Sequence, residues 1–263
     1  MDLPAFFQQI LPVNFCPVSF RIDHDIAHLT DAKTAVQEMF KCMEDKIERY
    51  ISKIAQDDRA AVVLAGDIIN NGLKSSKTNV YEEKYPPREQ KRRAIELLKP
   101  IANKIITMVP GNHERRSAKE SDTDITWDMC DALGVEYVGD MAFVKISVGS
   151  KRNQKPATYS ILVTHGAGGG ALIGSGLNRS DKMQMAVEGL DIIISGHTHK
   201  ASKTPSARLV FDPYNNKVTV KNTLLFVCTA WLDYGGYPTQ SMMPPVAFYP
   251  DHIRLSGREK EWK

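Results

Sequence analysis

Cysteine is scarce in this chain of 263 residues. Its scarcity argues against two classes of small protein, disulfide-rich domains and zinc ribbons. The four cysteines stand far apart, at positions 16, 42, 130 and 228, and no two of them form a Cys-x-x-Cys pair. A disulfide framework and a zinc ribbon both need closer, paired spacing. A chain of this length can also bury a sizeable core without such staples. We therefore expect isolated thiols in a reducing compartment.

Long hydrophobic runs and a dominant charge are also absent. No stretch approaches 18 consecutive apolar residues, which argues against a membrane-spanning helix. The apolar residues 1–20 have no basic segment and are interrupted by Pro4 and Pro17, so they do not resemble a signal peptide. The formal net charge of +3 is too small to indicate nucleic acid or an anionic membrane as the partner. These features predict a cytoplasmic protein with no membrane partner.

The pattern along the chain alternates between strands and helices without an internal repeat or a low-complexity linker, which predicts a single domain over residues 1–263. Continuous apolar runs, such as residues 60–65, are typical of strands covered on both faces. After about residue 205 the pattern is all strand and predicts late β-hairpins, with a turn at Asn215-Asn216. Strands are predicted at residues 17–22, 60–65, 104–109, 135–138, 142–148, 158–163, 191–195, 208–212 and 217–229, and helices at residues 31–54, 89–98, 124–133 and 181–187. This order indicates α/β layers.

Polar turns rich in histidine follow four of the buried strands. The carboxyl ends of strands in an open α/β sheet form the ligand crevice, so we expect these turns to converge on one edge. Imidazole and carboxylate together bind Mn, Fe, Zn or Ni, and a shared carboxylate can hold two ions. The pattern therefore predicts a metal site. The turns are Gly66-Asp67, Gly111-Asn112-His113-Glu114, His165-Gly166 and Gly196-His197-Thr198-His199.

The order of these motifs resembles that of the calcineurin-like metallophosphoesterases, in which Asp-x-His is followed by Gly-Asp, Gly-Asn-His-Asp/Glu, a lone His and Gly-His-x-His. The motifs span residues 23–199. The resemblance implies a four-layer α/β/β/α sandwich of two mixed sheets flanked by helices, with the site at the strand ends. Residues 70–87, the glycine-rich run after His165 and residues 234–237 are most similar to phage and prophage members. A phage-encoded protein would work in the host cytoplasm.

The resemblance further implies two adjacent divalent metal ions bridged by Asp67. The ligands of the first ion would be Asp23, Asp25 and His199, and those of the second Asn112, His165 and His197.

The first motif departs from the family pattern. The chain reads Asp23-His24-Asp25-Ile26-Ala27-His28, so Asp25 stands where the family has histidine. Residues i and i+2 of an extended strand point the same way, and we therefore expect Asp25 to act as a substitute ligand beside Asp23. His24 and His28 are the alternatives.

An added carboxylate makes the site harder and favours Mn or Mg over zinc; Mn is the expected ion, with Mg, Fe, Zn and Ni as alternatives.

The activity implied by the resemblance is hydrolysis of phosphate esters, and we expect phosphodiesters such as nucleotides or nucleic acid. Two ions about 3.5–4 Å apart lower the pKa of a bridging water and supply hydroxide. His113, which follows the ligand Asn112, is predicted to protonate the leaving oxygen. Because Asp25 replaces the usual histidine, a catalytically impaired scaffold or binding protein of the same fold is the second hypothesis.

Three further residues are predicted to contact the substrate. Arg115 and Arg116 follow the Gly-Asn-His-Glu turn, where a guanidinium could bind a phosphate oxygen. Gly168 lies in the glycine-rich run after His165. That run matches the dinucleotide pattern Gly-x-Gly-x-x-Gly/Ala, but no convincing βαβ unit begins the chain. We interpret it as a flexible, substrate-facing loop.

Overall fold

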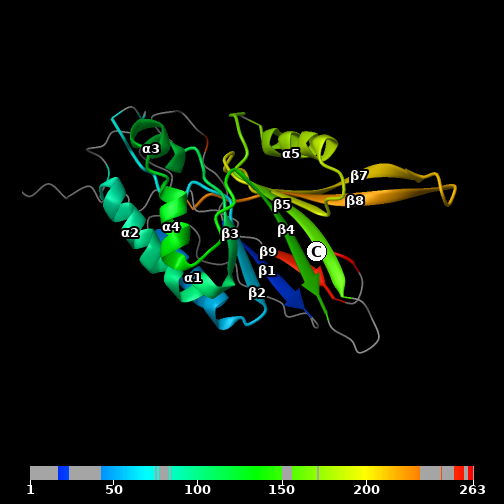
Figure 1. The fold of residues 1–263 in the computed structure, drawn as a ribbon, viewed down its shortest axis with the longest axis horizontal. Coiled ribbons are helices and arrows are strands. Elements are labelled where there is room, and N and C mark those ends of the chain that lie inside the picture. The colour runs from blue at the N-terminus through cyan, green and yellow to red at the C-terminus, as the bar shows by residue number, and fades with distance from the viewer. Residues whose placement is uncertain are drawn as a thin grey trace, which may run out of the picture.

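Two β-sheets lie between helices in the computed structural model (Figure 1), which describes residues 17–23, 43–74, 76, 83, 85–149, 156–170, 172–231, 244, 252–257 and 260–262. The helices are α1 (Met43–Gln56), α2 (Pro87–Leu98), α3 (Glu114–Ser121), α4 (Ile125–Leu133) and α5 (Gly174–Ala186), with the 3-10 helix η2 (Lys99–Lys104). The strands are β1 (Pro17–Asp23), β2 (Ala60–Leu64), β3 (Ile105–Met108), β4 (Met141–Val148), β5 (Ala157–Thr164), β6 (Ile192–Ser195), β7 (Ser202–Asp212), β8 (Lys217–Val227) and β9 (His252–Ser256). Their order is β3-β2-β1-β9 in one sheet and β4-β5-β6-β8-β7 in the other.

Three apolar clusters hold four layers together. Successive side chains of a strand point to opposite faces, so Val62 and Leu64 of β2 pack toward the helices that cover the first sheet, whereas Val63 packs between the two sheets. On the outer face of the second sheet, Leu162 and Ile193 pack under α5. Figure 1 shows α1 to α4 on one side of the sheets and α5 over the other side. The predicted four-layer α/β/β/α fold is confirmed.

The directions of the strands decide where the polar turns meet. β2 and β3 are parallel neighbours, and so are β5 and β6, so the turns after each pair emerge at one edge. β1 is antiparallel to β2: Pro17 pairs with Leu64, and Arg21 pairs with Ala60. The carboxyl end of β1, at Asp23, therefore lies at the edge where β2 begins.

Several elements differ from the sequence prediction. The predicted strand at residues 135–138 is a single bridge between Tyr137 and Met108. Helix α5 begins at Gly174, before the predicted start, and neither α3 nor β9 was predicted. The first part of the helix predicted over residues 31–54 lies outside the described residues, as do Cys16 and Cys42. The single-domain assignment stays a prediction.

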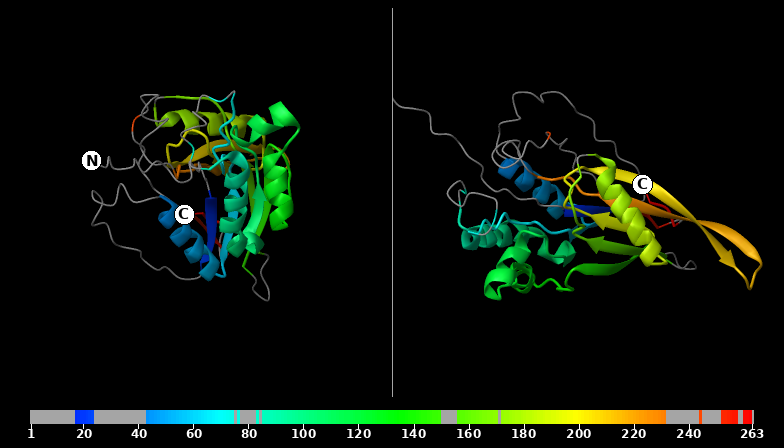
Figure 2. Two further views of the ribbon diagram at one scale, coloured as in Figure 1. Left: turned by 90° about the vertical axis from the view of Figure 1, so that its left-hand side faces the viewer. Right: turned by 90° about the horizontal axis from the view of Figure 1, so that it is seen from above.

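The late hairpin is confirmed and is longer than predicted. β7 and β8 pair continuously from Ser202 with Val227 to Asp212 with Lys217. Its tip extends beyond the rest of the sheet (Figure 2). Within the described part of the chain, no helix combines the length and apolar character needed to cross a membrane.

Candidate metal centre

Two glycine turns, one after β2 and one after β3, pack directly against each other. Gly66 has a φ of +83°, and a Cβ there would lie 2.6 Å from the backbone nitrogen of Gly111. A Cβ on Gly111 would lie 2.1 Å from Oδ1 of Asp67. Real Cβ atoms do not approach other atoms so closely, so only glycine permits this contact. The contact brings Asp67 next to the turn that carries Asn112.

The buried carboxylate of Glu114 joins the same two turns. Its Oε1 accepts hydrogen bonds from the backbone N–H of Ile68 and Ile69, at 2.6 and 3.0 Å, and its Oε2 accepts from Asp67 and Gly111, at 2.9 and 2.8 Å. Burial and the nearby Asp67 carboxylate raise the pKa of Glu114, while these backbone donors oppose the shift. Sequence analysis assigned no role to Glu114, although its place at the end of the motif was the available signal.

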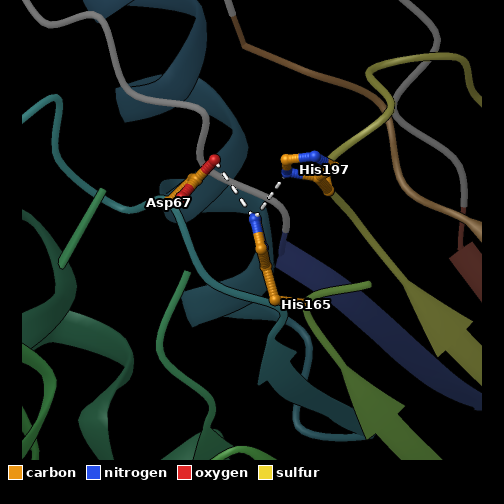
Figure 3. Close-up of side chains that lie close together, drawn as sticks. All are labelled: Asp67, His165 and His197. Atoms are coloured by element: carbon orange, nitrogen blue, oxygen red, sulfur yellow. Dashed lines mark hydrogen bonds and ion pairs between the residues drawn. The ribbon is translucent and has the colours of Figure 1, made fainter. Parts of the chain in front are cut away.

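Four side chains from four turns meet at one point, and Figure 3 shows three of them, Asp67, His165 and His197. The Nε2 atom of His165 lies 3.3 Å from Oδ2 of Asp67, 3.0 Å from Oδ1 of Asn112 and 3.1 Å from Nδ1 of His197. Nδ1 of His197 lies 2.8 Å from the same Asn112 oxygen. Asp67 and Asn112 follow strands of the first sheet, and the two histidines follow strands of the second. The cluster therefore links the two sheets.

The protonation states in this cluster depend on the Asp67 carboxylate. Nδ1 of His165 donates to the carbonyl oxygen of Ala65 at 2.7 Å, so in the neutral ring Nε2 carries the lone pair. Burial disfavours the charge on Asp67, but its hydrogen bond to His165 and the nearby His113 outweigh that and hold the pKa of Asp67 below its ordinary value. Burial and His165 lower the pKa of His197. Burial by itself would lower the pKa of His165, but its hydrogen bond to Asp67 and the charge of that carboxylate outweigh burial and raise the pKa. An ionised Asp67 and a neutral His197 are thus favoured, whereas His165 holds a proton that a bound cation would displace.

The backbone at these turns adopts a conformation that residues other than glycine rarely take. Asp67, His197 and His199 have φ of 53°, 65° and 59°, in the left-handed region. Such strain persists where the surroundings impose it, and it is concentrated at functional sites. Burial lowers the pKa of His199 to about 4, which keeps its imidazole neutral at pH 7. His199 is therefore also held in the form that binds a metal.

His113 precedes helix α3 and faces the cluster. Its backbone N–H donates to Oδ1 of Asp67 at 3.0 Å, and its Nδ1 donates to the carbonyl oxygen of Asn70 at 2.9 Å. This leaves Nε2 on the side of Asp67, 3.8 Å from Oδ2. Burial lowers the pKa of His113. Gln90, which sequence analysis did not single out, fixes this turn because its Oε1 accepts from the backbone N–H of Asn70 and Asn71, both at 3.0 Å.

The residues predicted to contact substrate occupy different surroundings. Arg115 forms an ion pair with Asp140, with Nη2 and Oδ1 2.5 Å apart. Arg116 donates to the carbonyl oxygen of Asn70 at 2.9 Å and so lies beside the His113 turn. Gly168 has a φ of +71° and lies against the guanidinium of Arg179, a residue that sequence analysis missed.

Asp23 is the last residue of β1, and only its backbone is described. Because β1 is antiparallel to β2, Asp23 lies near the start of β2, and Asp67 follows its end. The assignment of Asp23 as a metal ligand therefore stays a prediction. Asp25, His24 and His28 lie outside the described residues, so their part in metal binding stays a prediction.

The donor set fits a divalent cation. Two imidazoles, one carboxylate and one amide oxygen are ligands for a first-row metal such as Mn, Fe or Zn. In the neutral ring, Nε2 of His165 directs its lone pair at the oxygens of Asp67 and Asn112, and a cation among them would take the place of the proton that Asp67 otherwise favours there. These residues would hold the ion.

Comparison with known families agrees with this geometry. The sequence model of the calcineurin-like phosphoesterases matches residues 26–201, about two thirds of the chain. The match includes every residue of the cluster and begins after Asp25. No curated protein matches the chain significantly. The finer resemblance to phage members stays a prediction, and residues 234–237 lie outside the described part. The chain belongs to the calcineurin-like phosphoesterases, which implies a metal-dependent hydrolase of phosphate esters.

Proposed function

We propose that the protein hydrolyses phosphodiesters, such as nucleotides or nucleic acid, with two divalent ions, Mn²⁺ in preference. The observation that carries this proposal is the convergence of Asp67, Asn112, His165 and His197, which are connected by contacts of 2.8–3.3 Å between their ligand atoms. One ion would take these four residues. A second would share Asp67 and take the half-buried, neutral His199.

Each residue would then have a distinct task. When bound, the ions activate a water molecule and neutralise phosphoryl oxygens. Asp67 holds the negative charge between the two metal positions, and Glu114 fixes the backbone on both sides of it. His113 presents Nε2 toward the same space, where it would give a proton to the leaving oxygen. The carboxylate and amide oxygens among the ligands are the reason for preferring Mn²⁺ to zinc.

The test is a comparison of bis-p-nitrophenyl phosphate with p-nitrophenyl phosphate, with Mn, Mg, Fe, Zn or Ni added to protein purified without metal. We expect hydrolysis of the diester to be fastest with Mn²⁺, and metal analysis to give two ions per chain. His165→Ala should abolish both activity and metal binding. A folded protein that is inactive with every metal would contradict the proposal and favour the scaffold hypothesis.

A matched control separates loss of ligands from loss of fold. His252 lies on β9, away from the cluster, and is partly exposed. His252→Ala removes an imidazole without removing a proposed ligand, so it should keep the metal content of the unchanged protein. Equal loss of metal from His165→Ala and His252→Ala would show that the cluster is not the binding site.

A further inference from the structure

A cavity of about 260 Å³ borders the candidate metal centre on the side of the second sheet. Gly166 and Gly196 line it, and each is the chain neighbour of a proposed ligand, His165 or His197. The opposite wall is helix α5. A substrate whose phosphate lies at the metal centre would therefore have this cavity within reach of its organic group.

Arg179 of α5 lines this cavity, and no carboxylate among the described residues pairs with it. Its side chain is exposed, and no hydrogen bond or ion pair joins it to any residue that the structure describes. By contrast, Arg115 is paired with Asp140. Arg179 lines the same cavity as Gly196, the chain neighbour of His197, so the guanidinium lies near the metal ligands. A guanidinium without a carboxylate partner, beside a phosphoesterase centre, is suited to bind a phosphate oxygen.

The glycine-rich loop provides the space that this guanidinium occupies. A Cβ on Gly168 would lie 2.1 Å from Nη2 of Arg179, so a side chain there would displace the guanidinium from its present position. The other end of the cavity is also closely packed, because a Cβ on Gly176 would lie 2.7 Å from Oγ1 of Thr198. The absence of side chains at these two glycines thus leaves room for Arg179 and for Thr198.

The lining suits a flat ring with polar edges. Thioethers and hydroxyls both face the cavity: Met141, Met183, Thr164, Ser180, Ser195 and Thr198. Oγ1 of Thr198 is buried without a hydrogen-bond partner, whereas the hydroxyls of Ser180 and Ser195 lie 3.0 Å apart and bond to each other. Methionine sulfur contacts aromatic rings favourably, and an unsatisfied hydroxyl can bond the edge of a nucleobase. A purely aliphatic group would leave that hydroxyl unpaired.

We propose that this cavity and Arg179 form the nucleoside subsite of the enzyme, with a nucleobase in the cavity and a phosphate oxygen on the guanidinium. The inference rests on the proposed phosphoesterase function and adds its substrate class, a nucleotide or the end of a nucleic acid strand. It also assigns Arg179 as the substrate-binding arginine.

The experiment uses calorimetry, with Mn²⁺ present, to measure the binding of two ligands. These are adenosine 5′-monophosphate and ribose 5-phosphate, which lacks the base. We expect the unchanged protein to bind the nucleotide about tenfold more tightly, as one base contact contributes. Arg179→Gln should weaken the binding of both ligands about tenfold. Lys182→Gln, which removes a charge from an exposed position of the same helix, should weaken neither.

A second variant tests the cavity itself. Ala167 lines the cavity but its side chain is exposed, so Ala167→Leu narrows the entrance with little risk to the fold. It should remove the preference for the nucleotide over ribose 5-phosphate, whereas Ala132→Leu on the exposed face of α4 should keep that preference.

Two results would overturn the inference. Equal affinity of the unchanged protein for the two ligands would exclude a base subsite. Equal ligand affinities of Arg179→Gln and Lys182→Gln would exclude a role of Arg179 in binding the phosphate. Both readings come from binding without turnover, so they are independent of the diester assay. Failure of that assay alone would contradict the proposed function and leave the binding result standing.

Discussion

His113 is the residue at this centre whose geometry is suited to moving a proton. The hydrogen bond from its Nδ1 to the carbonyl of Asn70 fixes both the tautomer and the ring, so the other nitrogen is held toward Asp67. Burial lowers the pKa of His113, so in the free enzyme the ring is neutral and Nε2 carries a lone pair. A phosphate dianion bound beside it would favour protonation of Nε2, and the imidazolium would then give that proton to the leaving oxygen.

Replacing this residue should separate chemistry from metal binding. We expect His113→Asn to lower kcat on bis-p-nitrophenyl phosphate by about 10²–10⁴-fold, the range typical of a lost general acid. The metal content should not change, because His113 is not among the proposed ligands. Steady-state kinetics and metal analysis of the same preparation check this. Full activity in the variant would remove His113 from the mechanism.

Glu114 is a second single residue on which the centre depends, because its carboxylate accepts hydrogen bonds from the backbone of both turns. In Glu114→Gln one acceptor oxygen becomes an NH₂ group, and two buried N–H donors face it without an acceptor. Each unsatisfied group costs about 1–3 kcal/mol. We therefore expect the free energy of unfolding to fall by about 2 kcal/mol or more, measured by denaturant titration. Glu136→Gln, at an exposed position, should change it by less than about 0.5 kcal/mol; an equal loss in both would contradict this role.

At the scale of elements, the packing of two turns depends on the absence of a side chain at Gly66. Gly66→Ala should suffer both a strained φ and a clash with Gly111 and with Nδ1 of His165, 2.7 Å away. Gly139→Ala is the matched control, because Gly139 has a similar φ of +77° but nothing within 4 Å of its Cβ position. We expect the control to lose about 1 kcal/mol of stability and keep its metal, while Gly66→Ala loses metal affinity as well. Calorimetric titration with Mn²⁺ distinguishes them, and equal affinities would refute the packing argument.

An apolar pattern in the sequence predicts some elements of this fold and not others. The runs at residues 60–65 and 104–109 identified β2 and β3 because strands covered on both faces are apolar throughout. Their terminal turns could then be assigned to one edge. Helix α3 could not be predicted, since residues 114–121 contain almost no apolar side chain to give a helical period. Its start is fixed by the contacts of Glu114 and not by an amphipathic face.

Strand direction could not be predicted in the same way. The pattern that identifies β1 is the same whether the strand runs parallel or antiparallel to β2, so the expectation for Asp23 depended on the family motif alone. Strand β9 pairs with β1 from the far end of the sequence, and its five residues carry little signal of their own. The Asp67, Asn112, His165 and His197 cluster could be predicted because each residue ends a strand recognisable by itself.

For the whole molecule, the candidate centre is a junction between two sheets. Asp67 and Asn112 belong to turns of the first sheet, and His165 and His197 to turns of the second. An ion held by all four would bind the folded chain and have no comparable site in the unfolded chain. Metal binding and folding are therefore expected to be coupled.

This coupling predicts a change in Tm. At a Mn²⁺ concentration of about 100 times Kd, binding adds about 2.7 kcal/mol to the free energy of unfolding. For a chain of this size that corresponds to a rise in Tm of about 5–10 °C, which EDTA should reverse. Scanning calorimetry checks both directions. His197→Ala should fold with the Tm of the metal-free protein and show a much smaller response to Mn²⁺, because one of the four ligands that join the sheets is gone. A rise of the same size in that variant would mean that the ion binds elsewhere, and no rise in the unchanged protein would mean that the convergence of these side chains is not a metal site.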